Sequence, residues 1–299
     1  MYLSYSGYKT YVDCPRAYWH RYINKTVAPK PDNRVHMLYG ETVGKLFEAF
    51  YNEQIWKNNV TATLLERVER TMQKIISSEV KKGGVFNWTD TTLKPGTRSL
   101  SEVEVEVRET IPRGLKTIRH HRLLGQDAAA EVKLDETVDG KHILAGRADI
   151  LMRRAKPHGD LVILDGKGSR WRDKYVNRNQ LLWYAMLYWL RSGAIPDRLG
   201  FVFWRFEPEE SVDWSEVTIS EVRSLHLAAL EAIEGIESSQ RDLVQLKVKD
   251  PVAKVPGMIF WANPSSACKL CSYLPLCPEG SKKPPKGSAL GVEEGDFTF

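Results

Sequence analysis

The feature that most constrains the fold is a run of three strand-like segments followed directly by an amphipathic helix. Residues 131–138, 142–154 and 160–168 are rich in β-branched and aliphatic residues and are separated by the short turns VDGK and KPHG. The apolar residues of 177–193 then recur at helical spacing, and the segment ends on Gly193, a typical C-cap residue. Strands mixed with helices in one continuous stretch predict an α/β or α+β core.

Further elements are expected on both sides of this stretch. The alternation in SEVEVEV at 101–107 suits a strand, but a helix accounts for it equally well, and both remain open. Loops are expected at 24–34 and 92–100. The spacing of apolar residues predicts helices at 4–23, 37–56, 62–81, 110–124 and 220–246, and strands at 198–206 and 214–219.

The composition is that of a globular chain. Of its 299 residues 42% are apolar, and the 21 glycines and 15 prolines are ordinary, which excludes a disordered or collagen-like chain. Charge interrupts the apolar runs before the ~18 residues that a membrane span requires. Because the first residues show no apolar signal segment, we expect a cytoplasmic location, bacterial or in the host if phage-encoded. The net charge of +5 is too modest to identify a partner.

Two acidic residues and a lysine stand at the ends of neighbouring predicted strands. A tight turn between the strands would bring Asp149 and Asp165 side by side, and Lys167, two residues on, would share a face with Asp165. Two carboxylates can hold a hard divalent cation, and a lysine beside them can orient water or stabilise charge on a phosphate. This set suits phosphodiester hydrolysis. The alternative is three turn residues, since a D-x-K triplet is common by chance.

All four cysteines occur in an arrangement that suits a metal centre. Cys268, Cys271 and Cys277 follow the pattern C-x2-C-x5-C, and Cys14 precedes a proline near the other end of the chain. Thiolates are soft ligands that suit zinc or an iron–sulfur cluster, and the spacing does not separate these two. Unrelated buried thiols are the alternative. A shared centre would tie the two ends of the chain together.

Two basic stretches are candidates for contacts with nucleic acid. The second stretch runs on from Lys167 and interleaves cations with aromatic residues, a pattern typical of a groove for single-stranded nucleic acid. A solvated surface is the alternative for both stretches, and proximity to Lys167 favours DNA for the second. The first stretch contains Arg113, Lys116, Arg119 and Arg122, and the second contains Arg170, Trp171, Arg172, Lys174, Tyr175 and Arg178.

The last residues, 279–299, lack a core pattern and are expected to be disordered. They end in acids followed by Phe297 and Phe299, which could dock in a basic, apolar pocket of a recombination or single-strand-binding partner. A plain disordered tail is the alternative. The chain has no G-x-x-x-x-G-K-[ST] motif, so no nucleotide cofactor is expected, and no membrane partner is indicated either.

The segment GRADIL, a turn and VILDGKG, followed by a Q-x-x-x-Y helix, resembles the RecB-like branch of the PD-(D/E)XK nuclease superfamily. That branch includes the AddB nuclease domain and nucleases of CRISPR adaptation and of phages. The resemblance implies an α/β, restriction-endonuclease-like core with a mixed central sheet flanked by helices. It implies that Asp149 and Asp165 bind Mg²⁺ or Mn²⁺, that Lys167 acts in catalysis, and that Gln180 and Tyr184 support the site.

The chain departs from this branch at one position. The branch usually carries a histidine four residues after a glycine on its first core helix, whereas here Gly44 follows Gly40. Glu48, one turn on, could lend an oxygen to the metal in its place, as could Glu41 before it. Glu131 occupies the place of a further metal-binding acid of the branch, with a solvated acid as the alternative. We expect weakened metal coordination around an intact acid–acid–lysine core.

The resemblance extends to the cysteines. In that branch one N-terminal cysteine joins a C-terminal C-x2-C-x5-C around a 4Fe-4S cluster, which favours iron–sulfur over zinc and gives the cluster a structural role. The resemblance implies one nuclease domain at 1–278, in which 1–36 and 256–278 are joined by the cluster and 37–255 hold a helical region and the nuclease core. The implied activity is that of a metal-dependent DNA exonuclease. A non-catalytic, iron–sulfur protein that binds DNA ends and a site-specific endonuclease are the alternatives.

Overall fold

The structure, a computed structural model, describes residues 1–26, 35–57, 59–81, 99–125, 127–154, 158–172, 176–249 and 258–281. The chain divides into two compact units. The terminal unit comprises 1–30, 135–146 and 220–299, and the core unit comprises 31–134 and 147–219. The single domain expected at 1–278 is not tested by this division and stays a prediction.

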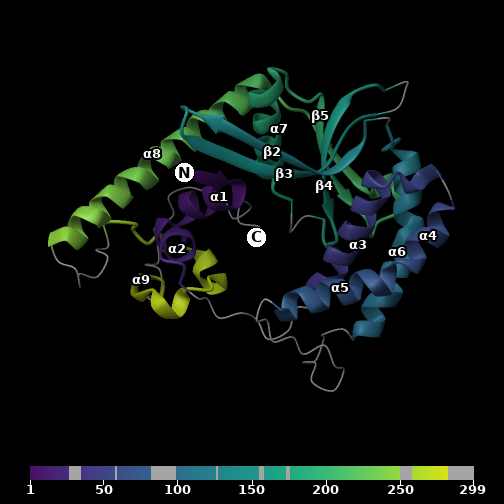
Figure 1. Ribbon diagram of the computed structural model, residues 1–299, viewed down its shortest axis with the longest axis horizontal. Coiled ribbons are helices and arrows are strands. Elements are labelled where there is room, and N and C mark those ends of the chain that lie inside the picture. Colours follow the sequence, from purple (N-terminus) through teal and green to yellow (C-terminus); the bar gives the residue numbers. More distant parts are fainter. Residues whose placement is uncertain are drawn as a thin grey trace. The chain divides into compact units, whose positions relative to one another are not determined.

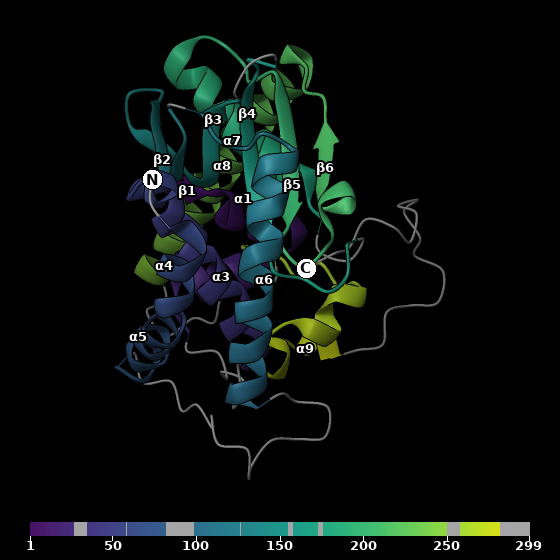
Figure 2. The same ribbon diagram turned by 90° about the vertical axis from the view of Figure 1, so that its right-hand side faces the viewer.

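The core unit combines a group of helices with most of a β-sheet (Figure 1). Helices α3, α4, α5 and α6 pack against one another (Figure 2), and α7 packs on β4 and β5. The helices are α3 (Val35–Asn52), α4 (Val60–Glu66), α5 (Val68–Lys81), α6 (Leu100–His120) and α7 (Arg178–Ser192), with 3-10 turns at Ile55–Lys57 and Pro208–Glu210. The strands are β4 (Leu161–Lys167), β5 (Arg198–Phe203) and β6 (Val212–Ser215), while β2 (Ala129–Val138) and β3 (His142–Arg153) belong to both units along the chain.

The sheet is mixed. In the core unit β3 is antiparallel to β4, β4 is parallel to β5, and β5 is antiparallel to β6, while β2 pairs with β3. The first four residues of β4 are fully or nearly fully buried, as expected for a strand with a parallel neighbour. These strands and helices enclose one apolar core, in which the Phe47 ring stacks on the Trp204 indole at 4.1 Å between centroids. The predicted α/β core with a mixed sheet flanked by helices is confirmed.

The segment that suited either a strand or a helix lies in α6. Ser99 and Glu102 form a capping box, in which the Ser99 hydroxyl accepts from the Glu102 N–H at 3.1 Å and the Glu102 carboxylate accepts from the Ser99 N–H at 2.7 Å. Val103 and Val107, four residues apart, are buried on one face, whereas Val105 is exposed. The box and the buried face explain why the alternating valines form a helix.

The strand expected at 214–219 begins two residues earlier and ends four residues earlier, at Val212–Ser215. β6 pairs with β5 from Val212 to Ser215, where it is opposite Leu199 near the start of β5. The chain beyond Ser215 passes the beginning of its partner strand, and α8 starts at Ile219. Other boundaries also differ, because the helix expected at 62–81 is divided into α4 and α5 at Arg67. The basic helix expected at 110–124 is the last part of α6, which ends at His120.

The terminal unit holds both cysteine-bearing segments. The long helix expected at 4–23 is broken at Cys14, whose φ of −161° is extended. Pro15 follows it, and a residue before proline is disfavoured in the helical region. The elements are β1 (Tyr2–Ser4, parallel to the start of β3), α1 (Tyr5–Asp13), α2 (Pro15–Tyr18), a π-helical turn (Trp19–Ile23), α8 (Ile219–Lys249), 3-10 turns (Ser266–Leu270 and Leu274–Leu276) and α9 (Pro278–Ser281).

Two expectations fall partly outside the described residues. Of the tail at 279–299, only the first three residues are described, and they lie in α9. Lys174 and Tyr175 of the second basic stretch also lie outside. In the part of the chain that the structure describes, every helix is too short or too polar to cross a membrane.

Candidate active site

The two predicted carboxylates meet at the end of β4. Asp165 follows the buried apolar run of that strand and is only 2% exposed. Asp149 lies on β3, and its Oδ2 accepts a hydrogen bond from the backbone N–H of Gly166 at 2.8 Å. Gly166 has no side chain, and a Cβ there would lie 2.8 Å from the Trp204 Nε1. The antiparallel pairing of β3 and β4 therefore brings Asp149 to the backbone of Gly166, the residue after Asp165, and this glycine has no room for a side chain.

A side chain from α7 joins the acid to the lysine. The Gln180 Nε2 donates to the Asp165 Oδ1 at 3.0 Å and to the Tyr184 hydroxyl at 2.9 Å. The Lys167 ammonium forms an ion pair with the Asp165 carboxylate and donates to the Gln180 Oε1 at 3.5 Å. Gln180 and Tyr184 stand four residues apart on one face of α7, as the Q-x-x-x-Y pattern predicts. One carboxamide thus holds the predicted acid, lysine and tyrosine in one cluster.

The electrostatics of this cluster are dominated by burial. Burial, together with the negative charge of Asp165, raises the pKa of Asp149 to about 8, although the Gly166 N–H and the Lys167 ammonium act in the opposite direction. Burial also raises the pKa of Asp165, which the ion pair with Lys167 opposes. Burial raises the pKa of Tyr184 too, so its hydroxyl stays protonated. Two desolvated carboxyl groups therefore share the positive charge of Lys167, which does not balance two negative charges.

The donor set fits a hard divalent cation. Asp165 Oδ2 is buried, and apart from its ion pair with Lys167 it accepts no hydrogen bond from any described residue. Asp149, Asp165 and the backbone carbonyl of Gly166 could hold Mg²⁺ or Mn²⁺ through oxygen. No three His, Cys, Asp or Glu side chains of the described segments are grouped to hold a metal ion. The remaining ligands would be water or phosphate oxygens, as is usual for Mg²⁺.

Glu131 lies within electrostatic reach of this cluster. Its negative charge contributes to the raised pKa values of Asp149 and Tyr184. Its carboxylate accepts from the Arg147 guanidinium at 3.2 Å. The backbone of Glu131 has a φ of +56°, which is uncommon for a residue other than glycine and is often found at functional sites. Its predicted role as a metal ligand stays a prediction.

The structure does not connect Glu48 with the two aspartates. The Glu48 carboxylate pairs with Lys45, and it lines a separate groove of about 760 Å³ between α3 and α5. Gly44 is exposed, and a Cβ there would meet no atom within 4 Å. The other glycine of the pattern, Gly40, lies close to Gly168, the residue that follows Lys167. A Cβ on Gly168 would lie only 2.8 Å from the Gly40 Cα.

The predicted nucleic-acid contacts differ in their surroundings. Trp171 is exposed beside Arg170, whose guanidinium contacts Glu106 at 3.2 Å. Arg172 pairs with Asp213, and Arg178 donates to the Glu216 carbonyl at 2.7 Å. In the first stretch, Arg113 lies half-buried on α6, Lys116 and Arg119 are exposed on that helix, and Arg122 is exposed beyond its end.

Sequence reasoning missed two residues that hold the end of β4. The backbone N–H of Trp204 donates to the Lys167 carbonyl at 3.2 Å, and the Arg205 Nε donates to the Gly168 carbonyl at 2.6 Å. Both residues follow β5, the parallel neighbour of β4. The carboxyl ends of parallel strands lie at one edge of a sheet, where sites in α/β proteins form. The Trp-Arg pair directly after a buried strand was therefore a usable signal.

The four cysteines line one pocket of the terminal unit, together with His20 and Tyr273, whose rings stack at 5.1 Å. All four are of intermediate exposure, and none of them forms a disulfide with another described cysteine. Burial raises the pKa of Cys271 and of Cys277, and the neighbouring Cys14 raises both further. The thiols line one pocket, but in the described segments no three His, Cys, Asp or Glu side chains form a group that could hold a metal ion.

Comparison with known proteins agrees with this site. A model of the PD-(D/E)XK nuclease superfamily matches residues 2–278, so the chain belongs to this superfamily. Its members generally use divalent metal ions such as Mg²⁺ or Mn²⁺. No curated protein sequence matches the chain.

Similar solved structures are distant. One is a candidate exonuclease from Eubacterium rectale, with 14% identity, a TM-score of 0.44, and coverage of 90% of this chain and 92% of the other. Another is a protein named SSO0001, with 13% identity, a TM-score of 0.31, and coverage of 85% and 90%. Neither likeness is strong enough to support a functional argument.

Proposed function

We propose that this nuclease-superfamily protein is a metal-dependent DNA exonuclease that acts on single-stranded DNA or DNA ends in recombination, repair or replication. The observation that carries the proposal is the convergence of Asp149, Asp165 and Lys167 in one buried cluster, braced by Gln180. A cytoplasmic location belongs to the same proposal.

The residues of the cluster would divide the work of phosphodiester hydrolysis. Asp149 and Asp165 would hold a divalent cation, which activates water and offsets charge on the phosphate when bound. Lys167, held by Asp165 and Gln180, would orient the attacking water and stabilise the negative charge that develops in the transition state. Gln180 would fix the Asp165 carboxylate in one orientation. This matters for the rate, because a small displacement of a catalytic group slows the reaction.

The exposed cations and aromatics would guide a DNA strand to this cluster. Arg170 and Trp171 follow Lys167 within four residues, so a strand bound there would lie close to the lysine. Guanidinium groups bind phosphates, and the exposed Trp171 ring can stack on an unpaired base. Because stacking on Trp171 requires an unpaired base, single-stranded DNA or frayed ends would be the preferred substrates.

The proposal includes a structural 4Fe-4S cluster held by the four cysteines, with zinc as the alternative. Its support is that Cys14, Cys268, Cys271 and Cys277 line one pocket. Iron and sulfide assays on protein purified without oxygen would decide the question. Four iron atoms per chain would support the cluster, and stoichiometric zinc without iron would exclude it.

A partner-docking role of the acidic–aromatic tail, 279–299, is a further part of the proposal. Deleting 280–299 is expected to abolish capture of a single-strand-binding protein without changing the nuclease rate. Unchanged capture would refute the docking role.

The test of the nuclease is degradation of 5′- and 3′-labelled single- and double-stranded DNA with Mg²⁺ or Mn²⁺. Asp165→Ala and a chelator are the controls. Metal-dependent trimming from an end that Asp165→Ala abolishes would support the exonuclease, and the order in which label is released would give its polarity. Discrete internal fragments would indicate an endonuclease instead. Well-folded protein that binds DNA ends without cleaving them would indicate the non-catalytic alternative, consistent with Gly44 in place of the histidine.

A further inference from the structure

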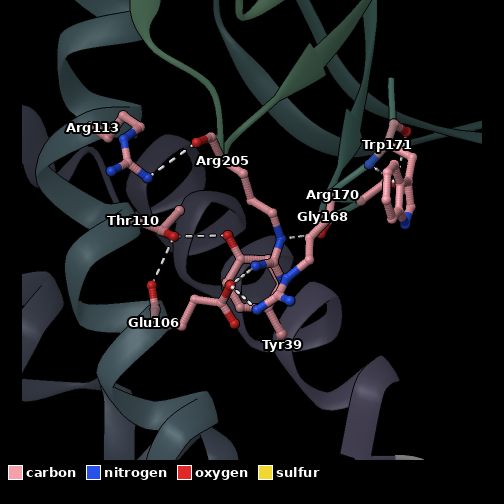
Figure 3. Close-up of polar contacts among 9 residues, drawn as sticks. Tyr39, Glu106, Thr110, Arg113, Gly168, Arg170, Trp171 and Arg205 are labelled. Carbon is pink, nitrogen blue, oxygen red and sulfur yellow. Dashed lines mark hydrogen bonds and ion pairs between the residues drawn. The ribbon is translucent and has the colours of Figure 1, made fainter. Parts of the chain in front are cut away.

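Three arginines from separate segments of the core unit converge on one pocket. Arg113 comes from α6, Arg170 from the segment after β4, and Arg205 from the segment after β5 (Figure 3). The pocket has a volume of about 310 Å³. Its other lining residues are Glu106, Glu109, Thr110 and Phe206.

Arg205 is the fixed member of the three. Its side chain is 12% exposed, its guanidinium lies 3.3 Å over the centre of the Tyr39 ring, and its Nε donates to the Gly168 carbonyl at 2.6 Å. The Tyr39 hydroxyl is hydrogen-bonded to the Thr110 Oγ1 at 2.7 Å, and burial raises the pKa of Tyr39 to about 12. The ring therefore stays neutral, and the guanidinium is preorganised by a cation–π contact.

Arg113 and Arg170 are more exposed and surround the same space. Arg113 donates to the Arg205 carbonyl at 3.1 Å and to the Glu207 carboxylate at 3.1 Å, while the Arg170 side chain is 59% exposed. A guanidinium carries five N–H groups in a planar fork, and these contacts use only one or two of them. The pocket thus offers N–H donors from two accessible arginines beside a rigid third one.

Glu106 supplies a negative charge that Arg170 and Arg205 share, whereas Arg113 pairs with Glu207. Its carboxylate pairs with Arg205 and, at 3.2 Å, with Arg170 (Figure 3). The carboxylate resembles a phosphate in charge and in its fit to a guanidinium fork. It therefore holds the pocket in the geometry that an incoming anion would require.

We propose that the pocket lined by Arg113, Arg170 and Arg205 binds one phosphate of the nucleic-acid strand in the active site, and that Glu106 occupies the guanidinium groups of Arg170 and Arg205 in the free protein. The inference rests on the proposed nuclease function and specifies how that site holds its substrate. Arg205 bonds to Gly168, the residue next to Lys167, so the pocket is built on the end of the catalytic strand. A phosphate held there would keep the strand in place during hydrolysis of a neighbouring bond.

The test measures the binding of labelled single-stranded oligonucleotides by fluorescence anisotropy. All variants are made in the cleavage-deficient Asp165→Ala background. Arg113→Gln and Arg170→Gln are each expected to weaken binding about tenfold, the effect of losing a charge-assisted hydrogen bond. Loss of one phosphate contact is expected to lower the slope of log affinity against log salt by about 0.7. Arg70→Gln, the same charge change on α5, is the matched control and is expected to leave affinity nearly unchanged.

Glu106→Gln gives the decisive second variant. If Glu106 competes with phosphate, its neutralisation is expected to tighten oligonucleotide binding severalfold. Equal or weaker binding by Glu106→Gln, in protein with an unchanged unfolding midpoint, would overturn the competing role of the carboxylate. Unchanged affinity and salt slope in both arginine variants would overturn the pocket as a phosphate site.

Oligonucleotides with a 5′-phosphate, a 3′-phosphate or no terminal phosphate identify the source of the phosphate. A preference for one phosphorylated end that Arg170→Gln removes would indicate a terminal phosphate, and equal losses for all three would indicate an internal one. Both results support the pocket. Cleavage by protein with intact Asp165 is measured in parallel. If the protein with intact Asp165 cleaves DNA and the arginine variants bind as tightly as the unaltered background, the phosphate pocket is refuted and the nuclease function is not. If the arginine variants bind more weakly and the protein with intact Asp165 does not cleave, only the nuclease function is refuted.

Discussion

The close approach of Gly40 and Gly168 allows a test of how the end of β4 is positioned. In Gly168→Ala, the added Cβ would lie 2.8 Å from the Gly40 Cα and 3.2 Å from two atoms of the Tyr39 ring. Carbon atoms pack favourably at about 3.5–4.0 Å, so α3 and the end of β4 would have to separate by several tenths of an ångström or more. Overpacking of this kind costs about 1–3 kcal/mol.

Part of this cost is offset in the unfolded chain. Replacing glycine by alanine stabilises a protein by about 0.4–1 kcal/mol where the backbone permits, because the unfolded chain loses freedom. We therefore expect Gly168→Ala to lower the free energy of unfolding by about 1.3 kcal/mol, the difference between the midpoints of these two ranges. Since Gly168 follows Lys167 directly, the nuclease rate should fall by more than the stability loss explains, up to about 100-fold for a 1 Å displacement.

Gly40→Ala is the matched control, because it adds a methyl group to the other residue of this contact without entering the contact itself. A Cβ on Gly40 meets no atom within 4 Å, and the residue lies inside α3. We expect it to stabilise the protein by about 0.5–1 kcal/mol through helix propensity. Urea unfolding measures both variants. A Gly168→Ala protein as stable as Gly40→Ala would refute the close packing of the two segments.

Three further predictions concern the cluster itself. The pKa of Asp149 in the folded protein is raised to about 8, so its ionisation destabilises the metal-free fold increasingly as pH rises from about 4 to 8. Asp149→Asn should therefore unfold at a higher temperature than wild type at pH 8, and the difference in unfolding temperature should shrink towards pH 5. A difference that stays constant with pH would contradict this. Gln180→Ala removes the donor to Asp165 and should lower kcat about 10–100-fold with little change in KM, measured by steady-state cleavage; a change in KM alone would contradict the positioning role. A histidine side chain at position 44 would enter open space, and Gly44→His should restore the metal ligand that the resemblance implies and so lower the Mn²⁺ concentration for half-maximal cleavage. An unchanged half-maximal concentration would show that a side chain at position 44 does not reach the metal.

Local rules predicted the residues that converge in the cluster. The two-residue period of a strand placed Asp165 with Lys167, a tight turn placed Asp149 beside them, and the four-residue spacing on a helix aligned Gln180 with Tyr184. Each rule relates residues within one element or between two consecutive ones. The structure shows these side chains in contact or in electrostatic reach of each other.

Tertiary packing decided what the sequence did not reveal. Glu106 and Arg205 are almost a hundred residues apart, and their ion pair depends on α6 lying beside the end of β5. The alternating valines of α6 favoured two structures equally until the capping box and the buried face selected a helix. Glu48, which has helical spacing from Gly44, faces a groove with α5 instead of the aspartates. The ion pair, the groove and the buried face of α6 depend on packing between different elements, whereas the capping box is a local contact.

The most direct test of the central proposal is single-turnover cleavage of a labelled oligonucleotide by wild type and Lys167→Ala at saturating Mg²⁺. Both proteins are first shown to be folded and to bind the oligonucleotide equally. We expect wild type to cleave and Lys167→Ala to be slower by about 10²–10⁴-fold, the range for loss of a group that acts on the transition state. Equal rates, or cleavage that persists in both without divalent metal, would contradict the assignment of Asp149, Asp165 and Lys167 as the active site.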